Sequence, residues 1–118
     1  MNTRKAILIY VYAERIKSEL IIASNLLAKM DHIEGNERLG AEKMMISLLE
    51  ALAGEIRIAQ HVERSMNFIG AERRIMEAMG KITLQDKLEV NKCISEALSL
   101  ITTCSAGAMK VLMSQQLI

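Results

Sequence analysis

The feature that most constrains this chain is a set of long apolar stripes with helical spacing and no proline to interrupt them. Proline is absent from all 118 residues, and six glycines supply most of the breaks. Apolar residues that recur every three or four positions mark one face of an α-helix. The chain also has one Phe, two Tyr and no Trp, which disfavours a β-sandwich or barrel. The sequence therefore predicts an all-α protein.

The first two helices are predicted from their apolar stripes and from the polar segment between them. One helix is expected over residues 3–31, with an apolar stripe from Ala13 to Met30, and the next over residues 38–66. Residues 32–37 contain Gly35 beside Asn36, which suit a tight connection. Asn67 is predicted to stop the second helix.

A short third helix is predicted over residues 71–79, with Gly80 just beyond its end. Glycine often follows a helix because it adopts a left-handed conformation without strain. Thr83 is predicted as the N-cap of the last helix, residues 83–115, with Asp86 three positions later as in a capping box. Long helices joined by short connections are expected to pack as an antiparallel bundle.

Length and helix layout predict a single domain, residues 1–118, completed by further copies of the chain. A chain of this length is of ordinary size for one domain. Three long helices and one short helix leave one side of a four-helix core incomplete. Residues 6–13, Ala-Ile-Leu-Ile-Tyr-Val-Tyr-Ala, are apolar on all sides of a helix and need cover from more than one neighbour. We therefore expect a homodimer or tetramer.

Charge and cysteine content limit the partners and the compartment. The 15 basic and 14 acidic residues give a net charge of +1, so nucleic acid is not an expected partner. The apolar run near the N-terminus is far shorter than the ~20 residues of a membrane-spanning helix, and no membrane partner is expected. Cys93 and Cys104 lie three helical turns apart, too far for an intrachain disulfide. Two reduced, buried thiols favour a cytoplasmic protein.

No complete catalytic or metal-binding motif is present, and no catalytic residue is assigned. His32 and His61 lack a glutamate three positions earlier, so the pairs typical of di-iron bundles are missing. No Gly-rich phosphate loop occurs. A basic cluster surrounds the predicted third helix and is interleaved with glutamates. It fits either an ion-paired solvated face or a small anion site for a phosphate, and consists of Arg57, Arg64, Arg73, Arg74 and Lys81.

Glutamates on the helices are the remaining source of chemistry, because Mg²⁺ prefers hard oxygen ligands. Glu50 and Glu55 are five positions apart and point about 140° from each other, so they cannot hold one ion together. Glu19 and Glu55 border apolar stripes and are predicted to be partly buried. Glu96 lies on the polar side of the last helix, where Lys92 can pair with it.

The order of two long helices, a short helix and a long helix resembles the all-α NTP pyrophosphatases, a superfamily that includes MazG, the dimeric dUTPases and phosphoribosyl-ATP pyrophosphatase. The resemblance implies hydrolysis of nucleoside triphosphates to monophosphate and pyrophosphate. It also implies Mg²⁺ held by Glu-Glu-x-x-Glu on one long helix and by Glu-x-x-Asp on a later one. The segment Gly54-Glu55-Ile56-Arg57-Ile58 keeps only Glu55 of the first motif, and Glu96-Ala97-Leu98-Ser99 keeps only Glu96 of the second.

Glu55 and Glu96 are therefore the candidate Mg²⁺ ligands, and the resemblance implies a MazG-like protein with a degenerate or inactive site. This function would require a nucleotide as partner. The alternative is a non-catalytic, self-associating helical interaction module. It rests on the apolar start of the first helix and on methionines, which suit adaptable interfaces: Met44, Met45, Met109 and Met113.

Overall fold

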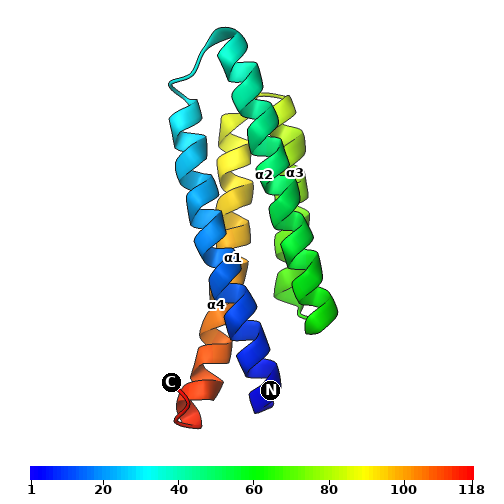
Figure 1. Cartoon of the computed structure of the whole chain (residues 1–118), viewed down its shortest axis with the longest axis vertical. Coiled ribbons are helices and arrows are strands. Elements are labelled where there is room, and N and C mark those ends of the chain that lie inside the picture. The colour runs from blue at the N-terminus through cyan, green and yellow to red at the C-terminus, as the bar shows by residue number, and fades with distance from the viewer.

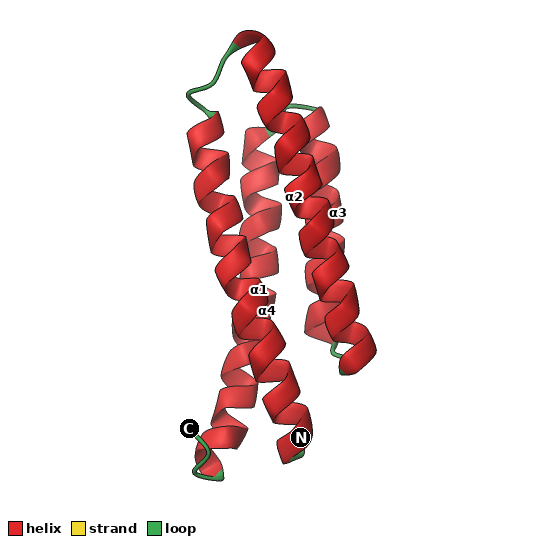
Figure 2. Cartoon of the chain, in the orientation of Figure 1, coloured by secondary structure: helices red, strands yellow, loops and turns green.

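The structure, a computed structural model, describes all 118 residues and contains four α-helices and no strand. The helices α1 (Thr3–Met30), α2 (Gly35–Val62) and α4 (Lys87–Ser114) have 28 residues each, and α3 (Met66–Thr83) has 18. Short connections join them (Figure 2). The prediction of an all-α protein is confirmed.

The four helices pack in a ring that follows their order in the chain. Both α1 and α3 pack beside α2 and α4, whereas α1 and α3, like α2 and α4, lie diagonally opposite, with no Cα atoms within 8 Å of each other. The molecule is 54 Å long and 22 × 18 Å across. This length exceeds the ~42 Å of a 28-residue helix because the helices are staggered. At one end α1 and α4 extend past the α2–α3 connection, and both termini lie there (Figure 1).

One face of every helix contributes to a continuous apolar core. Phe68, near the start of α3, is the largest fully buried side chain, and burying such a side chain contributes about 1.5–3 kcal/mol. In α1 the buried residues alternate at spacings of three and four, which confirms the predicted stripe. They are Ala6, Ile9, Ala13, Ile16, Leu20, Ala23, Leu27 and Met30.

Three helices begin at a side chain that accepts a hydrogen bond from a backbone N–H of the first turn, as helix starts require. The fourth, α2, has no such cap and begins at Gly35, whose φ of +66° glycine adopts without strain. The capping residues, each with its N–H donor, are Asn2 with Lys5, Ser65 with Asn67, and Asp86 with Glu89.

The third helix differs from its prediction at both ends. It spans Met66–Thr83 rather than residues 71–79, so it is longer than predicted, although it is still the shortest of the four helices. Gly80 lies inside it with helical backbone and does not end it. Thr83 is its last residue, and its Oγ1 donates to the carbonyl oxygen of Met79 at 3.5 Å. The predicted N-cap role of Thr83 is therefore wrong, and Asp86 takes that role for α4.

The second helix is also bounded differently from its prediction. It begins at Gly35 and ends at Val62, whereas residues 38–66 were expected. Asn67 lies in the first turn of α3 and does not stop α2. The reason is local: Ser65 has extended backbone and caps α3, so the chain must leave the helical conformation before it.

The last helix is the most apolar of the four. After Glu96 the only charged side chain in the chain is Lys110. By length and composition alone, α4 is apolar enough to cross a membrane. A core helix of a soluble bundle meets the same criterion, and α4 supplies eight residues to the apolar core.

Candidate functional site

The two predicted metal ligands lie in different parts of the ring. Glu55 projects from α2 toward α1, where its Oε1 accepts a hydrogen bond from Arg15 Nη2 at 2.8 Å. Glu96 projects from α4 toward α3, where its Oε2 lies 2.8 Å from Arg74 Nε. Because α2 and α4 are diagonally opposite and the two carboxylates pair with arginines on different helices, the fold of one chain does not bring them together.

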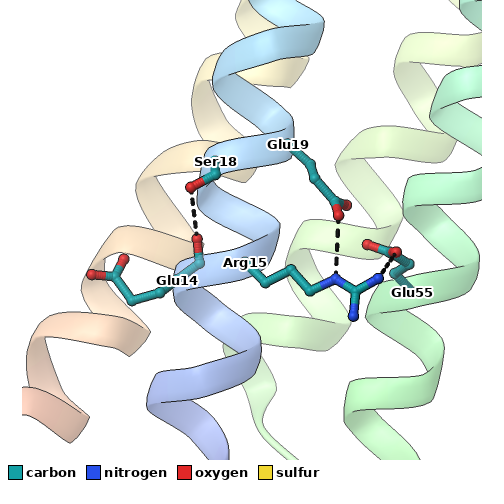
Figure 3. Close-up of polar contacts among 5 residues, drawn as sticks. All are labelled: Glu14, Arg15, Ser18, Glu19 and Glu55. Carbon is teal, nitrogen blue, oxygen red and sulfur yellow. Dashed lines mark hydrogen bonds and ion pairs between the residues drawn. The ribbon is translucent and has the colours of Figure 1, made fainter.

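Glu55 instead belongs to a charged trio with Arg15 and Glu19. Arg15 and Glu19 are one turn apart on α1, and Arg15 Nε donates to Glu19 Oε1 at 3.3 Å. The guanidinium thus lies between the two carboxylates and links α1 to α2 (Figure 3). The hydrogen bond to Glu19 and the charge of Glu55 raise the pKa of Arg15 above its ordinary value.

The trio has more negative than positive charge, and this affects Glu19. Partial burial, followed by the neighbouring Glu55 carboxyl, raises the pKa of Glu19 above its ordinary value, while Arg15 opposes the shift. The Oε2 atom of Glu55 is buried and accepts no hydrogen bond. Two carboxyls with one guanidinium between them can hold a proton or attract one further cation.

Two hollows flank the trio on the outer side of the α1–α2 contact. The larger, of about 290 Å³, is lined by Glu19, Glu55 and four apolar residues. The smaller, of about 80 Å³, is lined by Arg15, Glu55 and three residues that include Ile58. Both hollows are open to solvent, so an apolar group could rest against their walls while Arg15 and the carboxylates remain paired.

The residues of one chain do not fit the Mg²⁺ centre that the family resemblance implies. Mg²⁺ prefers a near-octahedral set of oxygen ligands. Glu55 is engaged by Arg15, Glu96 is engaged by Arg74, and no three His, Cys, Asp or Glu side chains lie close enough to hold a metal ion. Further protein ligands would have to come from a second chain.

On the α3–α4 side, Glu96 belongs to a structural ion-pair network. Arg74 joins Glu96 to Glu77, with 2.7 Å between Arg74 Nη1 and Glu77 Oε1. The partner of Glu96 is thus Arg74 across the helix contact rather than Lys92 on its own helix. Cys93 Sγ lies 3.7 Å from Glu77 Oε2, and burial together with that carboxylate raises the pKa of the Cys93 thiol.

Both cysteines are free and buried, as predicted from their spacing. The thiol of Cys104 lies 3.7 Å from the hydroxyl of Ser65, the cap of α3. Burial raises the pKa of Cys104, and the hydrogen bond with Ser65 partly opposes the shift. Because the thiolate is the reactive form of cysteine, both residues are expected to be inert.

A polar pocket at the loop end of the bundle escaped the sequence analysis. Its central residue is Glu42 on α2, which is only 8% exposed. Arg38 Nε lies 3.6 Å from Glu42 Oε2 and has no hydrogen-bond partner, while Arg38 Nη1 donates to the carbonyl of Met30 at 2.7 Å. The pocket beside this ion pair has a volume of about 30 Å³, which is room for one water molecule.

The sequence did contain a signal for this pocket. Glu42 precedes Met45 and Leu49 at the spacing of the buried stripe of α2, so it occupies a core position. A charged residue in a core position is costly unless it is paired, and Arg38 one turn earlier is the partner that the helix offers.

An uncovered apolar surface follows the α1–α2 contact on either side of the trio. Residues seven positions apart share a helix face, so the residues that line the two hollows extend into a continuous stripe. We call this stripe the seam face. Its exposed apolar members are Ile22 and Leu26 on α1 and Met44, Ile58 and Val62 on α2.

Searches with the chain find no matching protein family, no matching curated protein and no matching solved structure.

Proposed function

We propose that this protein is a non-catalytic helical module that associates with copies of itself in the cytoplasm through the seam face. Its four helices would form an antiparallel bundle, and a second copy would cover the apolar residues that one chain leaves in water. The observation that carries the proposal is the extent of that surface: Ile22 and Ile58, one on each helix, are 55% and 56% exposed.

The size and chemistry of the seam face support this proposal. Its five apolar residues leave several hundred Å² in water, near the upper limit for the largest patch on a monomer. A stable dimer buries roughly 800 Å² per partner, which the seam face and its rim can supply. In the middle of the seam face, Arg15 pairs with both Glu19 and Glu55. If a second copy covered this trio, only one excess negative charge would be left to neutralise.

The test is the mass of the native chain in solution. Sedimentation equilibrium over a range from about 1 µM to 500 µM should show a dimer or tetramer that dissociates on dilution. A chain that remains monomeric over the whole range would contradict self-association.

The second candidate is a degenerate MazG-like nucleoside triphosphate pyrophosphohydrolase that needs Mg²⁺. It is favoured by one observation, the approach of Glu19 and Glu55 beside a hollow of about 290 Å³, with Glu55 Oε2 left without a partner. In this case a second copy would complete the ligand set. Glu96, on the far side of the ring, could take part only if it faced another subunit.

Pyrophosphate release from a panel of nucleoside triphosphates, with Mg²⁺ and with Mn²⁺, tests this candidate. Activity that is lost in Glu55→Gln but kept in Glu50→Gln would establish an enzyme. Glu50 is the matched control because it is exposed on the same helix. No release from any nucleotide would leave the interaction module as the function.

A further inference from the structure

A hollow with basic walls lies on the α2–α3 side of the molecule, away from the seam face. It has a volume of about 210 Å³ and is lined by Arg57, Gln60 and His61 on α2, by Arg64 in the α2–α3 connection and by Ile69 on α3. Arg57 and His61 are four positions apart and share one face of α2, and Arg64 follows in the connection to α3. We call this site the basic hollow.

One wall of the basic hollow is held in place by Glu72 on α3. Arg57 Nε and Nη2 lie 3.0 and 2.8 Å from Glu72 Oε2, and Gln60 Nε2 donates to Glu72 Oε1 at 2.8 Å. Both oxygens of the Glu72 carboxylate are thus engaged, one by Arg57 and the other by Gln60. The guanidinium of Arg57 is fixed in orientation and keeps Nη1 free for a ligand.

The other two basic side chains of the basic hollow have no partner in the chain. His61 and Arg64 make no ion pair and no side-chain hydrogen bond, whereas the adjacent Glu63 is engaged by Lys5, with 3.7 Å between Lys5 Nζ and Glu63 Oε1. The start of α3, which carries the positive end of a helix dipole, lies beside them at Ser65. Two guanidinium groups and an imidazole therefore face one fully engaged carboxylate.

The geometry points to a binding site for a phosphate group in the basic hollow, either inorganic phosphate or the phosphate of a monoester. Guanidinium groups match phosphate oxygens with paired N–H donors. Arg57 would offer a fixed donor, His61 would donate from the next turn of α2, and Arg64 would reach the anion from the connection to α3. The site is independent of self-association, because it lies on another side of the ring.

Titration followed by amide chemical shifts tests this site on the full chain. Sodium phosphate and glycerol phosphate are added separately at constant ionic strength, with sodium chloride as the blank. Saturable shifts at the end of α2 and the start of α3 are expected. Arg64→Gln should weaken binding about tenfold, the effect of one charge-assisted hydrogen bond. His61→Gln should weaken it less.

Lys92→Gln is the matched control, because Lys92 is exposed on α4 without an ion pair and its loss removes the same unit of charge elsewhere. It should leave the affinity unchanged. Absence of saturable shifts up to about 50 mM, or equal weakening by Lys92→Gln and Arg64→Gln, would overturn the proposal. Tighter binding of glycerol phosphate would identify a phosphorylated metabolite as the ligand class, and equal binding would identify free phosphate.

Discussion

Replacement of Ile58 by alanine should weaken self-association without unfolding the chain. Ile58 is 56% exposed and lies beside the trio on the seam face. Full burial of an isoleucine side chain contributes about 1.5–3 kcal/mol, and roughly half of that surface remains for a partner to cover. Each copy would then lose about 1 kcal/mol.

Symmetry doubles the effect of this substitution. In a two-fold dimer the same residue contributes from both copies, so the total loss is about 2 kcal/mol. This corresponds to a rise of about thirtyfold in the dimer Kd. Sedimentation equilibrium measures the Kd, and circular dichroism in urea on dilute protein checks that the monomer keeps its stability.

The control for this prediction is Met76→Ala. Met76 is 55% exposed but lies on α3, away from the seam face, so its truncation should leave the Kd unchanged. If both variants weaken association equally, or if only Met76→Ala weakens it, the assignment of the interface to α1 and α2 is wrong.

Three further predictions concern the fold and the trio. Phe68→Ala should destabilise the chain by about 3–5 kcal/mol, because it empties a fully buried position; a loss under about 1.5 kcal/mol in urea unfolding would show that Phe68 is not packed as described. Asp86→Ala should cost about 1 kcal/mol as the loss of an N-cap, whereas Thr83→Ala should cost under about 0.5 kcal/mol; thermal melts in the opposite order would restore Thr83 as the cap. The pKa of Glu19 is raised in the folded chain, so the folded chain binds this proton more tightly than the unfolded chain does. The free energy of unfolding should therefore fall as the pH rises above 4.5, the ordinary pKa of a glutamate. Glu19→Gln should flatten that dependence, and an unchanged slope in urea melts across this range would refute it.

The parts of the fold that sequence could predict are those fixed by local periodicity. The stripe from Ala13 to Met30 is buried as expected, because a period of 3.6 residues places these positions on one side of a helix wherever it packs. The number of helices followed from the same signal. The helix ends were less certain, because glycine and capping residues are compatible with more than one backbone conformation.

Gly80 shows why such end signals fail. A glycine ends a helix only where the backbone turns to positive φ, and here that turn comes later, at Gln85 with φ 58°. Ile82 lies beyond Gly80 and is buried, and the packing of this residue keeps the last turn of α3 helical. Local sequence does not show whether such a tertiary contact exists.

The candidate site depended even more on contacts distant in sequence. Partial burial of Glu19 and Glu55 followed from their neighbours on each helix. Their link through Arg15 did not, because Arg15 and Glu55 are 40 positions apart and their pairing depends on the stagger of α1 against α2. Local spacing predicts Lys92, on the same helix, as the partner of Glu96. In the structure its partner is Arg74 on α3.

The closeness of the two chain ends has a consequence for connectivity. Thr3 and Gln115 share a hydrogen bond. Three of the four helix contacts in the ring are between helices that are consecutive in the chain, and the fourth, between α4 and α1, is made by side chains alone. A short linker from residue 118 to residue 1, with the backbone opened between α1 and α2, would keep every helix beside its present neighbours. The packing of the four helices therefore does not depend on where the chain begins. A circularly permuted chain should fold to the same ring of helices.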